Sequence, residues 1–250
     1  PTMDEYVEFV YIDNIPAFAD IKTSIKVLEK GVYRTESGKV QQFSAEEMKP
    51  SSLSFKIACK DPYWTKISRI KAKWYIKFVL NGGNPVTGTP NKNWRGIRPV
   101  HCREAVALFL NIGYMCTLEN FQKRISTFQG VLLDNNKNAV DTSKIISRLE
   151  NLSGFDIGLV YAGNGVAGLG GGRTWGVYQK SFLYHYENSG GCCTTIFHEL
   201  GHCLGYSHNS TMTYGQWASG CADVFYKNNI KDFPVNSHTI LKSRSNPNIY

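Results

Sequence analysis

One segment of eleven residues constrains the fold of this chain more than any other feature. It begins at His198, ends at His208 and also contains His202, so it includes three of the six histidines in the sequence. Apolar side chains recur at helical spacing through residues 192–204, which predicts a buried helix there. Side chains four positions apart lie on nearly the same face of a helix, so His198 and His202 can reach one ion. Gly205 can adopt a positive φ and turn the chain, which brings His208 to the same point.

Three imidazoles that leave one coordination position open form the kind of site that binds a catalytic zinc ion. Glu199 follows the first histidine and can point toward the metal without binding it, where a general base for an activated water must lie. The alternative interpretation is a chance match on an ordinary polar helix. However, this helix is otherwise apolar, and burying imidazoles and a carboxylate in it is costly unless a metal pairs with them. We therefore predict that one Zn²⁺ is bound by His198, His202 and His208.

The extended pattern resembles the signature of the metzincin clan of zinc endopeptidases, HExxHxxGxxH followed by a Met-turn. The chain continues with Ser210-Thr-Met212-Thr-Tyr214. The resemblance implies that Met212 forms the hydrophobic floor beneath the three histidines, a role that is compatible with plain core packing. Tyr214 matches the Ser-x-Met-x-Tyr form of the astacin and serralysin families, in which the tyrosine lies near the metal and helps to stabilise the oxyanion. The alternative for Tyr214 is an ordinary buried aromatic residue.

The region upstream is similar to the adamalysin (reprolysin) families in the order of its segments. A helix is followed by Asp156-Ile-Gly-Leu-Val-Tyr, a glycine-rich segment, Trp175-Gly-Val-Tyr-Gln and the active-site helix. In those families the glycine-rich segment is the edge strand of the sheet, which binds extended substrate through main-chain hydrogen bonds. The resemblance therefore places substrate contact at Val166, Ala167, Gly168 and Leu169. The upstream and downstream likenesses point to different families, so the family within the clan stays open.

Chemistry and resemblance together predict a zinc-dependent endopeptidase that acts on protein or peptide substrates. Glu199 would take a proton from a zinc-activated water and pass it to the leaving amine, while zinc, with Tyr214, stabilises the oxyanion. A non-enzymatic alternative is a metzincin-like binding domain whose activity is lost or is blocked by the N-terminal segment. The resemblance implies a secreted or cell-surface protein. A chain that begins at Pro1 rather than Met also predicts that a targeting segment has been removed.

Strands mixed with helices predict an α/β or α+β fold, and the resemblance adds a twisted mixed sheet beside the active-site helix. Alternating apolar residues predict a strand over residues 74–80. A helix is expected over residues 98–112, stopped by Gly113, and a second helix after Asp141 as its cap. Further strands are expected at residues 155–162 and 174–179.

The first part of the chain carries no chemical motif. Its strand-like stretches are residues 6–12, 25–28 and 53–58. We expect residues 1–65 to form an N-terminal extension, a small domain or a prosegment, and residues 66–250 to form the catalytic domain.

Charge and hydropathy argue against two other classes of protein. The net charge is +8, from 28 basic and 20 acidic residues. No nucleic-acid-binding signature accompanies the basic residues, and a run of such residues is usually a solvated surface. No apolar run approaches the ~20 residues that a membrane-spanning helix needs. We therefore expect neither nucleic-acid binding nor a membrane span.

A second motif favours a different function. Gly163-Asn-Gly165-Val-Ala-Gly168 matches the GxGxxG of dinucleotide-binding sites and follows a predicted strand. Such a site needs a helix that opens directly after the loop, because the pyrophosphate lies at the helix N-terminus. The residues that follow are rich in glycine and unfavourable for a helix. We therefore interpret the glycines as part of an edge strand and its loop.

The remaining cysteines and histidines give weaker indications. The seven cysteines, an odd number, show no CxxC spacing, so the redox compartment stays undecided. His101, His185 and His238 are expected to be surface or capping residues rather than metal ligands.

Overall fold

The chain divides into two compact units, Pro1–Ala58 and Cys59–Tyr250. The computed structural model describes residues 12, 31–34, 40–43, 61–80, 93–161, 165–179, 181, 185 and 192–236, with backbone alone at 31–34, 40–43, 192 and 193. The strands expected at residues 6–12, 25–28 and 53–58 lie outside the described residues, apart from Ile12, which is not in a strand.

The described part of the first unit is a pair of antiparallel strands. β1 (Gly31–Arg34) pairs with β2 (Val40–Phe43), with Gly31 opposite Phe43 and Arg34 opposite Val40. The role of residues 1–65 as an extension, small domain or prosegment stays a prediction.

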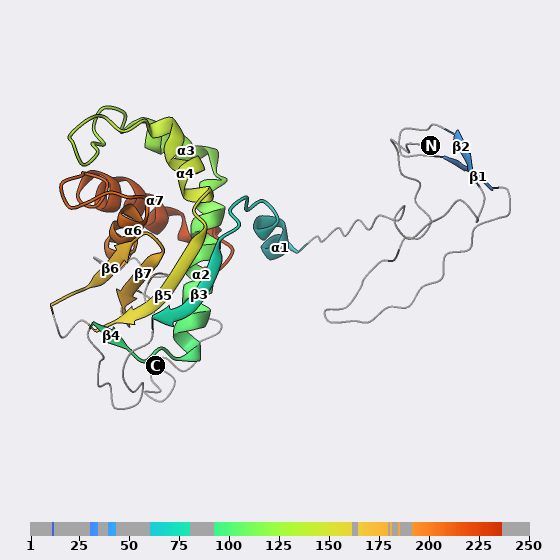
Figure 1. The fold of residues 1–250 in the computed structure, drawn as a ribbon. Coiled ribbons are helices and arrows are strands. Elements are labelled where there is room, and N and C mark those ends of the chain that lie inside the picture. Colours follow the sequence, from blue (N-terminus) through green and yellow to red (C-terminus); the bar gives the residue numbers. More distant parts are fainter. Residues whose placement is uncertain are drawn as a thin grey trace. The chain divides into compact units, whose positions relative to one another are not determined.

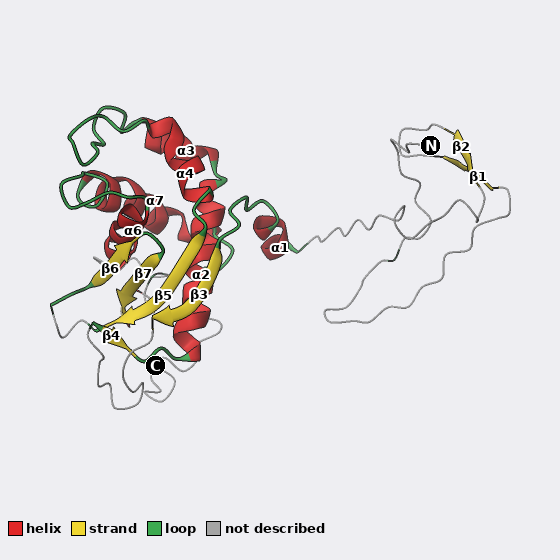
Figure 2. Cartoon of the chain, in the orientation of Figure 1, coloured by secondary structure: helices red, strands yellow, loops and turns green. Residues whose placement is uncertain are grey.

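The second unit contains a mixed sheet and several helices, which Figures 1 and 2 show as ribbons. Its strands are β3 (Tyr75–Leu80), β4 (Trp94–Arg95), β5 (Gly154–Val160), β6 (Gly168–Gly171) and β7 (Thr174–Tyr178). Its α-helices are α1 (Pro62–Ile67), α2 (Pro99–Cys116), α3 (Glu119–Ser126), α4 (Ile145–Glu150), α6 (Cys192–Cys203) and α7 (Val224–Asn229). Short 3₁₀ segments span Thr142–Lys144 and Ile230–Asp232, and a π-helix spans Gln216–Asp223.

The sheet is open and mixed, in the strand order β3-β5-β7-β6. The short strand β4 pairs with the C-terminal end of β5. β3, β5 and β7 run parallel, whereas β6 runs antiparallel to β7 and is last in the order. Helices combined with this sheet confirm the predicted α+β class. Among the described residues, no helix is both long enough and apolar enough to cross a bilayer.

One face of the sheet packs against α2 and α6. Phe109 of α2 stacks on Phe155 of β5 at a centroid distance of 4.5 Å and meets the ring of Trp175 of β7 edge-on at 4.9 Å. The Trp175 indole N–H donates to the carbonyl of Ile196 in α6. These aromatic residues are buried, so the core lies between the sheet and the two helices.

Helix α2 does not end where the sequence predicted. It continues through Gly113 to Cys116, so the prediction that Gly113 stops this helix is wrong. Close packing accounts for the glycine instead, because a Cβ on Gly113 would lie 2.9 Å from Cγ2 of Ile70. The glycine is therefore explained by the approach of a neighbouring segment and not by a helix end.

The opposite face of the sheet carries glycines beneath a tryptophan. A Cβ on Gly158 of β5 or Gly176 of β7 would lie 2.5 Å or 2.4 Å, respectively, from ring atoms of Trp94. The indole of β4 therefore lies directly on the backbone of the two central strands.

Other predicted elements are confirmed with small changes at their ends. The strand predicted over residues 74–80 is β3, and those predicted at 155–162 and 174–179 are β5 and β7. Asp141 caps the helical segment that follows it, because its carboxylate accepts a hydrogen bond from the backbone N–H of Ser143 at 3.1 Å.

Candidate metal centre

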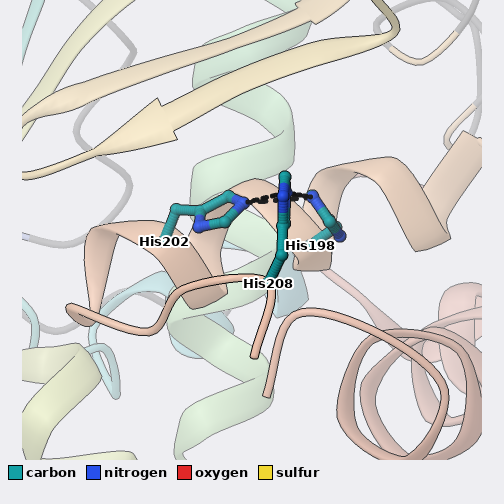
Figure 3. Close-up of side chains that lie close together, drawn as sticks. All are labelled: His198, His202 and His208. Atoms are coloured by element: carbon teal, nitrogen blue, oxygen red, sulfur yellow. Dashed lines mark hydrogen bonds between the residues drawn. The ribbon is translucent and has the colours of Figure 1, made fainter. Parts of the chain in front are cut away.

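The three histidines of the motif converge on one point. His198 and His202 lie one turn apart on α6, and His208 reaches the same place from the chain after the helix, as Figure 3 shows. The Nε2 atoms of His198 and His202 are 3.1 Å apart. Nε2 of His208 lies 3.0 Å from that of His202 and 3.3 Å from that of His198. The predicted ligand triad is therefore brought together in the folded chain.

This triangle of nitrogen atoms has the size that a small metal ion requires. Zn–N bonds of about 2.0–2.1 Å in a tetrahedral site place the ligand nitrogens about 3.3–3.4 Å from one another. The three separations, 3.0–3.3 Å, are close to that value. Imidazole nitrogens suit zinc and also copper, iron and nickel, so these donors would fit a transition-metal ion better than calcium or magnesium.

The outer nitrogens of two rings are bound by backbone carbonyls. Nδ1 of His198 donates to the carbonyl of Thr213, and Nδ1 of His202 donates to that of Tyr206 at 2.7 Å. A neutral imidazole that carries its proton on Nδ1 has a lone pair on Nε2. These two hydrogen bonds therefore orient both rings with lone pairs directed at the shared point.

The charge state of the rings supports the same conclusion. Burial, together with the neighbouring imidazoles, lowers the pKa of both His198 and His202, which favours the neutral rings that bind metals. Two Nε2 lone pairs then face each other at 3.1 Å with no proton between them. A cation held between the rings would compensate this repulsion.

The turn after α6 is a Schellman motif that Gly205 makes possible. Gly205 has φ of 89°, a value that L side chains rarely adopt. Its N–H donates to the carbonyl of His202 at 2.9 Å, and the N–H of Tyr206 donates to that of Gly201 at 3.1 Å. The predicted positive φ at Gly205 is confirmed, and the turn directs the chain back toward His198 and His202.

Glu199 is a buried carboxylate beside the triad. It is only 4% exposed, and its Oε1 lies 3.9 Å from Nε2 of His198. Burial raises the pKa of this carboxyl to about 8. A cation at the three imidazoles would favour the ionised form of this carboxyl group.

The edge strand makes room for this carboxylate. A Cβ on Gly168 would lie 2.2 Å from Oε1 of Glu199, and a Cβ on Gly170 would lie 2.5 Å from the Glu199 carbonyl oxygen. Both glycines stand opposite inward-facing residues of β7, on the face that α6 covers. Strand β6 can therefore approach α6 this closely only because these positions lack side chains.

The segment after His208 passes directly beneath α6. Met212 is fully buried, and a Cβ on Gly201 would lie only 2.4 Å from the Met212 carbonyl oxygen. Tyr214 is 53% exposed, with its ring centroid 4.6 Å from that of His198 and 5.3 Å from that of His208. Tyr214 is therefore not an ordinary buried aromatic residue, because it lies beside two of the imidazoles and is open to solvent.

The predicted substrate-binding residues lie at or just before the edge strand. Gly168 and Leu169 begin β6, whereas Val166 and Ala167 precede it, and the Ala167 carbonyl accepts a hydrogen bond from the N–H of Tyr178. The GxGxxG segment leads into this strand and not into a helix, so the structure lacks the helix that a dinucleotide site would need there. Substrate binding along β6 stays a prediction.

The other histidines take no part in the triad. His101 caps α2, where its Nδ1 accepts a hydrogen bond from the N–H of Arg98 at 3.1 Å. His185 is fully buried, so its expected position at the surface or a cap is wrong. Its ring contacts the Tyr226 hydroxyl at 2.9 Å and the Glu104 carboxylate at 3.2 Å. His238 lies outside the described residues.

Several supporting residues were not found by sequence reasoning. The guanidinium of Arg148 donates to the carbonyl of Leu204 at 2.6 Å and lies over the Tyr206 ring, so α4 supports the C-terminus of α6. The carbonyls that orient the histidines belong to Thr213 and Tyr206 and give no side-chain signal in the sequence. The glycine within the HExxH segment, Gly201, was a visible signal of close packing.

Comparisons with known proteins gave no match: no family model fits the chain, and neither a curated protein nor a solved structure is significantly similar to it.

Proposed function

We propose that this protein is a zinc-dependent endopeptidase. The proposal depends on one observation: three Nε2 atoms lie 3.0–3.3 Å apart beside the buried carboxylate of Glu199. Three histidines and one open position are the ligand set of catalytic zinc. The HExxHxxGxxH motif and Met212 add the resemblance to the metzincin clan, in which this arrangement hydrolyses peptide bonds.

His198, His202 and His208 would hold the metal. A zinc ion in this position supplies Lewis acidity, which lowers the pKa of water and polarises a carbonyl group. Glu199 accepts a proton from the attacking water and delivers it to the nitrogen of the leaving amine. The phenol of Tyr214, which lies beside His198 and His208, donates a hydrogen bond to the oxyanion of the tetrahedral intermediate.

An extended peptide would bind along β6. This strand is last in the sheet order and lies against Glu199 through Gly168, so a peptide paired with its outer edge runs past the catalytic carboxylate. Pairing through main-chain hydrogen bonds tolerates many substrate sequences. The proposed substrates are therefore unfolded or extended segments of proteins.

Two measurements test the proposal. Mass spectrometry of the purified chain is expected to find one zinc ion per molecule, and cleavage of denatured casein should stop with a chelator and return with added Zn²⁺. Bound zinc without cleavage, in the full chain and after removal of residues 1–58, would instead favour a metal-containing binding domain. Absence of a bound divalent metal would reject both functions.

A further inference from the structure

A loop outside the motif binds the turn that leads to His208. In this turn, residues 204–207, the Gly205 carbonyl accepts a hydrogen bond from Nδ2 of Asn135 at 3.1 Å. The N–H of Ser207 donates to Oδ1 of the same side chain at 2.7 Å. One amide group therefore binds the turn on both sides of Tyr206, with a donor and an acceptor that each match a backbone group.

The loop that presents Asn135 is itself ordered by hydrogen bonds. Oδ1 of Asp134 accepts from the backbone N–H of Asn136 at 2.8 Å and from that of Asn138 at 2.9 Å. The Asp134 N–H also donates to the Asn138 carbonyl at 2.8 Å, and Leu133 forms a β-bridge with Ala139. Asn135 thus projects from a closed hairpin, which limits the freedom of its side chain.

The same hairpin binds the chain on the other side of His208. The N–H of Leu133 donates to Oγ1 of Thr211 at 2.7 Å, and the Leu133 carbonyl accepts from Oγ of Ser210 at 2.6 Å. The N–H of Thr211 donates back to the Leu133 carbonyl at 3.1 Å. His208 is therefore held between two attachments to one hairpin, through Asn135 before it and through Leu133 after it.

His208 depends on these attachments more than the other ligands do. His198 and His202 are placed by α6, and their Nδ1 atoms are bound by the carbonyls of Thr213 and Tyr206. His208 lies outside any helix or strand and is exposed. We propose that Asn135 is a positioning residue for the third metal ligand, which keeps the 204–207 turn in the conformation that brings His208 to the metal. This inference rests on the proposed metal site.

The test is zinc affinity, measured in the full chain by competition with a chromophoric chelator. Loss of a group that orients a metal ligand typically weakens metal binding by about 10- to 100-fold, and we expect Asn135→Ala to do so. The matched control is Asn136→Ala, the next residue of the hairpin, which is exposed and contributes only its backbone N–H. This control should bind zinc with wild-type affinity.

A double-mutant cycle separates positioning from a general effect on folding. His208→Ala should weaken zinc binding, and adding Asn135→Ala to that variant should cost less affinity than Asn135→Ala costs in wild type, because only the part that acts on His202 through the Tyr206 carbonyl remains. The visible spectrum of the Co²⁺-loaded Asn135→Ala protein should also differ from wild type, since it reports ligand geometry. Thermal unfolding of the metal-free proteins should show that each variant is still folded at the temperature of the zinc assay.

The outcomes distinguish the two proposals. Wild-type protein that binds no zinc would overturn both the proposed function and the role of Asn135. Tight binding by wild type with equal affinity in Asn135→Ala would overturn the positioning role alone. An equal loss of affinity from Asn135→Ala with and without His208 would also reject it, because the effect would then not act through that ligand.

Discussion

The carboxylate of Glu199 lies directly against Gly168 of the edge strand, where a Cβ would be 2.2 Å from its Oε1. The two residues belong to elements that are separate in sequence, α6 and β6, and they meet on the buried face of the sheet. The proposed catalytic base and the proposed substrate-binding strand are therefore in contact, so a change in one is expected to affect the other.

Gly168→Ala should reduce peptidase activity and should cost less stability than the same change at Gly170. The added methyl group meets only the side chain of Glu199, from Oε1 to Cγ, and a side chain can shift at a smaller cost to folding than a backbone segment can. A displacement of about 1 Å at a catalytic group can lower kcat by about 100-fold. Casein cleavage measures the activity of the variant, zinc content measures its metal binding, and thermal unfolding measures its stability.

The matched comparison is Gly170→Ala on the same strand. A Cβ there would lie 2.5 Å from the Glu199 backbone carbonyl and cannot be accommodated by rotation of a side chain. This variant should lose stability by about 1–3 kcal/mol, as expected of an overpacked core position. Equal losses of activity and of stability in the two variants would contradict the proposed contact.

Glu199→Ala should retain zinc and lose turnover. The carboxylate is not among the three converging ligand atoms, so metal affinity has no direct reason to fall. Loss of general acid–base catalysis lowers kcat by about 100- to 10,000-fold. Zinc content and the rate of casein cleavage check the prediction, with Glu199→Gln as the isosteric comparison. A peptidase rate equal to that of wild type would remove Glu199 from the mechanism.

The three histidines of the candidate metal site could be predicted from the sequence because their geometry is local. His198 and His202 are related by one helical turn, and Gly205 marks the bend that returns His208, so spacing alone carries most of the information. The same local logic located β3, β5 and β7 and the cap at Asp141.

Contacts between segments that are distant in the sequence could not be predicted from local spacing. Glycine is common at helix ends, yet Gly113 lies inside α2, where the close approach of Ile70 explains the absence of a side chain. Asn135 is an ordinary turn residue in the sequence, and only the fold shows that its amide binds the turn before His208. Periodicity reports which face of an element is apolar but not which segment covers it.

Gly201→Ala tests the contact between α6 and the segment that contains Met212. Alanine favours a helix over glycine by about 1 kcal/mol, which on its own would stabilise α6. A Cβ at this position would lie 2.4 Å from the backbone carbonyl oxygen of Met212, which cannot move without displacing the turn. We expect a net loss of stability and a lower zinc affinity. A higher unfolding temperature than that of wild type would show that the turn does not pass so close to α6.

Acid should destabilise the protein partly through His101, which lies far from the metal ligands in the sequence. Burial, together with Arg98 and Arg95, lowers the pKa of His101 from 6.5 to about 4. Below pH 6.5 the unfolded chain binds a proton at this residue that the folded chain does not bind until about pH 4. Stability that is fully present above pH 6.5 is therefore lost as the pH falls through this window, by on the order of 3 kcal/mol.

His101→Gln isolates this contribution, since glutamine does not titrate. The variant should be less stable than wild type at pH 7, because it alters the ring nitrogen that accepts the Arg98 N–H at the start of α2. Between pH 7 and pH 4, however, its free energy of unfolding should fall less steeply. Urea denaturation of the metal-free proteins at a series of pH values measures both effects. Parallel pH dependences would mean that a buried group other than His101 accounts for the acid sensitivity.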